Sequence, residues 1–118
     1  DHRVLDGIAG LDTVEGLRYV GGREALYLTL LQRFCEHNAK LTVAIFASVA
    51  EANYEEARRH AHTIKGGAAT LGATAIAKLA VELETAIRDG ADPGRVRTLA
   101  AELDAATKAL TVEIARIA

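Results

Sequence analysis

The chain of 118 residues contains no methionine and no tryptophan, and it contains only one cysteine and one proline. A single cysteine, Cys35, rules out an internal disulfide and suits a reducing compartment, and its apolar neighbours predict a core or boundary position. No stretch approaches the roughly 20 apolar residues that span a bilayer and no signal peptide is visible, so we expect no membrane insertion. A start at Asp-His-Arg without methionine is typical of a module taken from a longer protein.

Aromatic residues and positive charge are also scarce, because aromatics make up 4% of the chain and the net charge is −2. A nucleic-acid binder needs a positive field or a surface of stacking aromatic and basic side chains, so we expect no nucleic-acid partner. The chain has no Gly-rich phosphate loop followed by Lys and Ser or Thr, and no paired-carboxylate motif for Mg²⁺. We therefore expect it to bind neither ATP nor a cofactor or metal of its own.

Helix-forming residues dominate what is present. Half of the residues are hydrophobic, alanine and leucine are the most frequent of them, and β-branched runs are few. Starting signals for helices occur at Asp12 with Glu15, Asn53 with Glu56, Thr74, and Asp92 before Pro93, and stopping signals occur at Gly21-Gly22, Gly72 and Gly90. A long helix over 23–52 has no glycine or proline, but its apolar stripe lapses near 37–38, which leaves one helix or two open.

The apolar stripes predict an all-α fold, an antiparallel four-helix bundle with a short additional N-terminal helix. We expect a single domain over 1–118, in which 1–22 form a lead-in with the short helix and 23–118 form the bundle. The stripes are Leu26, Leu30, Phe34, Leu41, Ile45 and Val49; Ala57, Ala61, Ile64, Ala68 and Leu71; Ile76, Leu79, Leu83 and Ile87; and Val96, Leu99, Leu103, Ala106, Leu110 and Ile117, after a sparse lead-in of Leu5, Ile8 and Leu11.

Two glycines stand inside the predicted histidine helix that ends at Gly72, although each costs about 1 kcal/mol relative to alanine. Gly66 follows His62 by four residues and so bares the helix surface beside the imidazole. At about 100° per residue, His62 points outward with Gly66 and Ala69 on its face, whereas His60 falls at the edge of the buried stripe. The bare surface indicates that something large must reach His62.

Cationic side chains surround this histidine within about one helical turn, namely Arg58, Arg59 and Lys65. A neutral imidazole is a competent nucleophile near pH 7, because the ordinary histidine pKa is about 6.5. The cations would favour an incoming anion and stabilise it once attached. Since phosphoryl transfer asks mainly for positioning and charge neutralisation, the chain could carry a phosphoryl group while a partner supplies metal and carboxylates.

The stretch AHTIKGGAATLGA (61–73) resembles the signature of histidine phosphotransfer (HPt) domains, with a phosphorylatable histidine, a lysine three residues on and a glycine four residues on. The upstream GLRYVGGREALYLTLLQRF (16–34) resembles the entry segment and first bundle helix of HPt modules at the C-terminal end of hybrid sensor kinases. Gly67 departs from the small residues of other kinds that such domains often carry, and its angle assigns it to close helix packing.

The resemblance implies that His62 is phosphorylated, that Lys65 steadies the phosphoryl group and that Gly66 leaves room for a response-regulator receiver domain. It further implies a cytoplasmic, monomeric phosphocarrier in a multistep two-component relay, which accepts the group from a receiver aspartate and passes it to another receiver. The expected partners are receiver domains, which would hold the Mg²⁺, and a cognate hybrid histidine kinase, free or covalently linked. The carrier could then be a module of a membrane-bound sensor kinase.

Three other functions fit parts of the sequence. A histidine-kinase dimerisation helix also carries an exposed histidine, but typically with a carboxylate after it where this chain has Thr63. A metal site from His60, His62, Cys35 or His37 is weakened because histidines two residues apart diverge around a helix. A scaffold bundle without chemistry remains possible, but it would leave Gly66 without a purpose.

Overall fold

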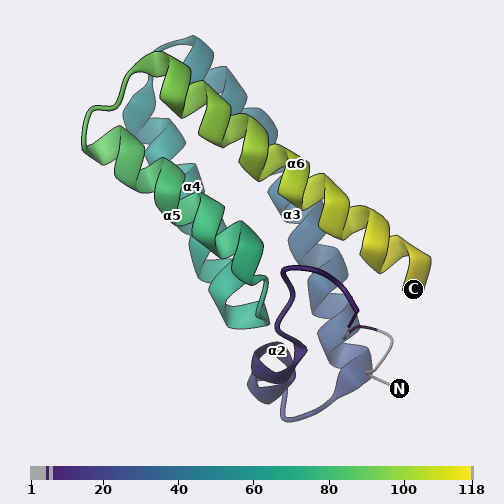
Figure 1. Cartoon of the computed structure of the whole chain (residues 1–118). Coiled ribbons are helices and arrows are strands. Elements are labelled where there is room, and N and C mark those ends of the chain that lie inside the picture. Colours follow the sequence, from purple (N-terminus) through teal and green to yellow (C-terminus); the bar gives the residue numbers. More distant parts are fainter. Residues whose placement is uncertain (1–4, 6, 118) are drawn as a thin grey trace.

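The chain forms a bundle of helices in the computed structural model, which describes residue 5 and residues 7–117 (Figure 1). Residues 1–4, 6 and 118 of the expected domain lie outside the described residues. The helices are α2 (Thr13–Tyr19), α3 (Glu24–Ala50), α4 (Tyr54–Leu71), α5 (Thr74–Arg88) and α6 (Pro93–Ile117), and the described part of the chain contains no strand. The predicted all-α class is confirmed, and α3 is one uninterrupted helix rather than two.

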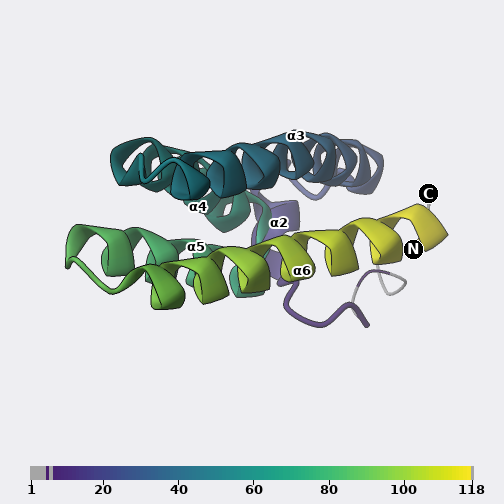
Figure 2. The same ribbon diagram turned by 90° about the horizontal axis from the view of Figure 1, so that it is seen from above.

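Helices α3 to α6 each pack against the next along the chain, and α6 closes the ring by packing against α3. Short turns connect them, so successive helices run antiparallel, and α2 lies across the end where α3 begins and α4 finishes (Figures 1 and 2). This is the predicted four-helix bundle with a short extra helix. It also puts the α4–α5 face on the side of the bundle opposite the α3–α6 face.

Most of the predicted helix ends are confirmed by their hydrogen bonds. The side chains of Asp12, Asn53 and Asp92 each accept from the backbone N–H three residues on, and Gly72 ends α4 in the left-handed region with φ 76°. The exception is Thr74, because the cap position belongs to Ala73 and has no side-chain bond. The Thr74 hydroxyl instead donates to the Gly10 carbonyl, at 3.1 Å, and so ties the lead-in to α5.

The core follows the predicted stripes on α4 and departs from them on α3. All five predicted α4 residues are buried. On α3, Leu26, Leu30 and Leu41 lie only partly buried, whereas Tyr27 and Leu31 are fully buried. The reason is the Tyr27 hydroxyl, which donates to the Leu71 carbonyl at 2.7 Å and draws that face of α3 inward. Burial, with the nearby Asp12 carboxylate, raises the pKa of Tyr27 to about 12.

On α5 and α6 the predicted stripes hold with a small shift. The buried members are Ile76, Leu83, Val96, Leu99, Leu103 and Leu110, while Leu79, Ile87, Ala106 and Ile117 lie partly buried against them. Cys35 is buried as expected, and burial raises the pKa of its thiol. Helices α5 and α6 therefore present the faces that their sequence periods predict.

Polar side chains form a layer between α3 and α6 that the apolar pattern did not predict. Asn38, Thr42 and Thr107 are each no more than 2% exposed. The Thr42 hydroxyl donates to Asp104 Oδ1 at 3.0 Å, and the Thr107 hydroxyl donates to the Leu103 carbonyl. The Asn38 Nδ2 group finds no hydrogen-bond partner among the described residues. This layer joins the two longest helices by polar contacts as well as apolar ones.

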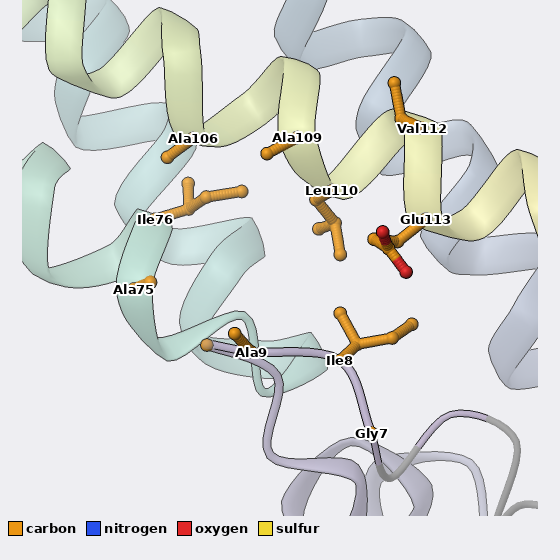
Figure 3. Close-up of a pocket in the computed structure, with 11 residues that line it drawn as sticks. Gly7, Ile8, Ala9, Ala75, Ile76, Ala106, Ala109, Leu110, Val112 and Glu113 are labelled. Carbon is orange, nitrogen blue, oxygen red and sulfur yellow. The ribbon is translucent and has the colours of Figure 1, made fainter.

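The lead-in packs against the bundle rather than extending from it, with Leu5, Ile8 and Leu11 all buried. Backbone bonds fix it to the α4–α5 turn: Asp12 N–H donates to the Gly72 carbonyl at 2.6 Å, and Ala75 N–H donates to the Gly10 carbonyl. A pocket of about 560 Å³ lies between the lead-in, α5 and α6, and Ile8 and Leu110 point toward one another across it (Figure 3). The lead-in thus holds the C-terminal end of α4, which follows the histidine segment, in a fixed position.

Candidate functional site

His62 stands on the outer surface of α4, and 60% of its side chain is exposed. Gly66 is exposed one turn later, and a Cβ atom built there would meet nothing within 4 Å. Ala69 is exposed on the same face. The structure therefore confirms two predictions: His62 points outward, and the helix surface beside it carries no large side chain.

A carboxylate from α5 contacts the ring. His62 Nδ1 lies 2.9 Å from Glu84 Oε2, and Lys65 Nζ lies 3.1 Å from Glu84 Oε1. Only 13% of the Glu84 side chain is exposed, so the contact is shielded from water on the carboxylate side. One carboxyl group thus bonds to the histidine through one oxygen and to the lysine through the other.

The charge on Glu84 decides which ring nitrogen is free. Burial opposes ionisation of this carboxyl, but hydrogen bonds from Lys65 and His62 outweigh it and hold its pKa below the ordinary glutamate value. An ionised carboxylate has no proton to donate, so the Nδ1–H of His62 must be the donor. In a neutral ring, Nε2 then keeps its lone pair and is the nucleophilic nitrogen.

The three predicted cations are placed differently. Arg58 comes within 3.5 Å of Glu84 Oε2 and also pairs with Glu55. Arg59 pairs with Glu56 and stays outside the cluster. Lys65, whose side chain is 33% exposed, is held on Glu84 near the Nδ1 side of the ring. The structure thus brings Arg58 and Lys65 together with His62 and leaves Arg59 on the outer surface.

On its other side, α4 borders a shallow apolar groove with α2 and α3. The groove has a volume of about 430 Å³ and its lining residues are Tyr19, Leu30, Arg33, Phe34, His37, Gly66, Gly67, Thr70 and Leu71. A Cβ atom on Gly67 would lie 3.2 Å from the Phe34 ring, which supports the predicted packing role of that glycine. Tyr19 is 64% exposed, so an apolar surface is available beside Gly66.

The other histidines do not join this site. His60 is 23% exposed and its Nε2 pairs with Glu56 at 3.2 Å, in the boundary position expected for it. His37 is exposed on α3 and lines the groove. Over the described residues, no three side chains of His, Cys, Asp or Glu come together in a way that would hold a metal ion.

Glu84 is the site residue that sequence reasoning missed. It follows the buried Leu83 on α5, a position at the edge of that helix's apolar stripe and therefore beside a neighbouring helix. The sequence does offer one signal for Glu84. It is a carboxylate at the edge of the apolar stripe of one helix, in a bundle whose preceding helix carries a histidine and a lysine. The axial register between α4 and α5, however, depends on tertiary packing and cannot be read from either helix alone.

Residues 29–116 match the family model of the Hpt domain, so the chain belongs to the Hpt domain family. Domains of this family are phosphocarriers that use a histidine in phosphorelays, without kinase activity, and they interact with response-regulator receiver domains and kinases. No curated protein and no solved structure matches the chain. None of the helices in the described part of the chain combines the length and apolar character that a bilayer crossing requires.

Proposed function

We propose that His62 is the phosphoryl-carrying residue, accepting the group from an aspartyl phosphate of one receiver domain and passing it to the aspartate of another. The observation that carries this proposal is the Glu84 contact, because it occupies Nδ1 and leaves Nε2 without that partner, on a side chain that is 60% exposed and one turn before Gly66. A scaffold bundle without chemistry would explain neither the Glu84 contact nor the open surface at Gly66.

The chemistry needs no acid or base from this chain. Nε2 attacks the phosphorus of the aspartyl phosphate, an N–P bond forms, and the O–P bond breaks with its electron pair returning to the receiver carboxylate. Since Nε2 carries no proton, none has to leave. The ring keeps its Nδ1 proton, which it donates to Glu84, and the negative carboxylate balances the positive charge that develops on the ring. The reverse sequence on a second receiver returns the imidazole, and Mg²⁺ would be supplied by the receiver.

Two cations support the anionic group in this proposal. Lys65 and Arg58 neutralise Glu84 before transfer, so the carboxylate does not repel the arriving phosphate. Once the phosphoryl group is attached, the long Lys65 side chain can turn its ammonium toward it, which is the stabilising role expected from the family resemblance. Arg59, bound to Glu56, contributes only to the surrounding field.

The receiver would dock over α4 and the groove lined by Tyr19 and Phe34, where Gly66 leaves the approach open. We expect the carrier to work in the cytoplasm, as a free protein or as the C-terminal module of a hybrid sensor kinase, because receiver domains and kinase modules work there. Neither arrangement requires the domain itself to enter a membrane.

The test is transfer from a phosphorylated receiver domain. The wild-type protein should acquire an acid-labile, alkali-stable phosphate, and His62→Gln should abolish it. His60→Gln is the matched control, because His60 pairs with Glu56 outside the Glu84 cluster and the groove, and this variant should leave labelling unchanged. Full labelling of His62→Gln, measured with retained helical circular dichroism, would disprove the assignment.

A further inference from the structure

The groove beside Gly66 is basic, although the chain as a whole is slightly acidic. Among its nine lining residues, Arg33 and His37 are basic and none is acidic. The whole chain has 16 acidic residues against 14 lysines and arginines. Each of three other cavities formed by the described residues is lined by at least one carboxylate. An acidic group of a partner would therefore meet no like charge among the residues that line this groove.

Arg33 is exposed on α3 and has no acidic partner within the described chain. None of the ion pairs there involves it, and Glu36, one turn later on α3, also leaves it unpaired. A guanidinium keeps its charge at any physiological pH, and its five N–H donors fit the two oxygens of a carboxylate. Other arginines already use such donors on a carboxylate of this chain, namely Arg18, Arg58, Arg59, Arg88 and Arg116. The donors of Arg33 are thus available to a partner.

Apolar surface lies next to this cation. Phe34 and Leu71 line the groove and are 9% and 7% exposed, and Gly67 presents no side chain beside them. Tyr19 adds an exposed ring from α2. The groove can therefore receive an apolar side chain of a partner, with Arg33 at its α3 edge. An apolar centre with charged groups around it is the common composition of a protein interface.

The groove adjoins the place where a partner reaches His62, because Gly66 lines it and follows His62 by one turn. A receiver domain that brings an aspartyl phosphate to His62 would therefore also cover the groove. The same face of the receiver carries the carboxylates that hold its Mg²⁺, and a fixed positive charge attracts such a face. The charge of the groove thus agrees with a receiver as its occupant.

We propose that Arg33 is a specificity-determining residue, which selects receiver domains that present a carboxylate beside the apolar side chain entering the groove. This inference rests on the proposed function, since a receiver is the partner in both. The ion pair forms on docking, at the edge of the contact, and takes no part in the transfer itself. A receiver with a lysine or an arginine at the same place is rejected, because two like charges would face one another.

The test is the rate at which His62 is labelled, measured against the concentration of the phosphorylated receiver domain that labels the wild type fastest. Arg33→Glu should lower kcat/KM at least about tenfold, through a higher KM and with kcat unchanged. Arg33→Lys keeps the positive charge and should lower kcat/KM much less. Added salt should reduce the difference between Arg33→Glu and the wild type, because ions screen charges at the edge of an interface.

Arg97→Glu is the matched control and should leave kcat/KM unchanged. Arg97 is also an exposed arginine without an acidic partner in the described chain. It lies near the start of α6, at the end of the bundle away from α2 (Figure 1). Substitution of the facing carboxylate on the receiver by lysine, found by changing the acidic residues of its docking face one at a time, should restore transfer to Arg33→Glu.

Phosphoramidate, a small phosphoryl donor that needs no docking surface, separates docking from chemistry and should label Arg33→Glu as fast as the wild type. Helical circular dichroism shows whether each variant is folded. An unchanged kcat/KM in folded Arg33→Glu, an equal loss in Arg97→Glu, or a loss confined to kcat would overturn selection by Arg33 and leave His62 as the carrier. A wild-type protein that no phosphorylated receiver labels would contradict the proposed function itself, and this inference with it.

Discussion

At the scale of single residues, Glu84 combines two functions that a substitution can separate. It orients the imidazole by accepting from Nδ1, and it supplies a negative charge beside the ring. A glutamine would still accept a hydrogen bond through its carbonyl oxygen but would carry no charge. An alanine would remove both functions. The difference between the wild type and Glu84→Gln therefore measures the contribution of the charge, and the difference between Glu84→Gln and Glu84→Ala measures that of the hydrogen bond.

We expect Glu84→Gln to slow transfer to His62 by a few fold and Glu84→Ala by about tenfold, because a hydrogen bond to a charged group contributes about 1.5–3 kcal/mol and tenfold in rate corresponds to about 1.4 kcal/mol. The measurement is the rate of labelling by a phosphorylated receiver as a function of pH, since loss of the carboxylate should also displace the pH profile. Glu82→Gln, two residues away on the same helix, is the control. Equal rates for all three variants and the wild type would exclude a positioning role.

The lowered pKa of Glu84 also predicts a dependence of stability on pH. A carboxyl group whose pKa is lower in the folded state stabilises the fold above its unfolded value, about 4.3, and this contribution is lost as the pH falls through the folded value. The difference in unfolding free energy between the wild type and Glu84→Gln should therefore be constant near neutral pH and shrink below about pH 4.3. Urea titrations at several pH values measure it, and a difference that grows on acidification would contradict the assignment.

At the scale of the helix, the glycine at position 66 makes α4 less stable than an alanine there would. Glycine is the weakest helix former apart from proline, and no neighbouring atom prevents a side chain at this position. The glycine is therefore not explained by packing within the chain. Gly67 is different, because the Phe34 ring lies against it.

We expect Gly66→Ala and Gly66→Leu both to raise the free energy of unfolding, by about 1 kcal/mol for alanine and a similar amount for leucine. Only the leucine should obstruct a docked receiver, so transfer should fall at least about tenfold in Gly66→Leu and much less in Gly66→Ala. Denaturant unfolding and receiver labelling of the same samples separate the two effects. Normal transfer in a stable Gly66→Leu protein would show that the open surface is not needed for access.

The sequence predicted individual helices better than the contacts between them. The caps at Asp12 and Asn53 and the left-handed Gly72 are local, since each depends on residues within one turn. The outward angle of His62 also follows from helical geometry alone. Glu84 and the bond from Thr74 to the lead-in were missed, because both depend on how separate elements meet.

At the scale of the whole molecule, the polar layer between α3 and α6 lowers the stability of the fold but helps to fix how the two helices align. Asn38 is 1% exposed, and its Nδ2 group has no partner within the described chain. A buried polar group without a partner costs about 1–3 kcal/mol. Buried asparagines in helical bundles fix the alignment of helices, because only one register satisfies their neighbours. Here the neighbouring Thr42–Asp104 bond is the contact that depends on the alignment.

Asn38→Leu should accordingly raise the free energy of unfolding by about 1 kcal/mol, since leucine has a similar shape and no amide to desolvate. Asn38→Asp should lower it, because a carboxylate at this position, which is 1% exposed, would be a buried charge without a partner. Urea unfolding midpoints at neutral pH measure both changes, and the α3–α6 contacts in the nuclear Overhauser spectrum show whether the register survives. A destabilised Asn38→Leu protein would mean that the amide is satisfied in solution, and the layer would then contribute to stability as well as to alignment.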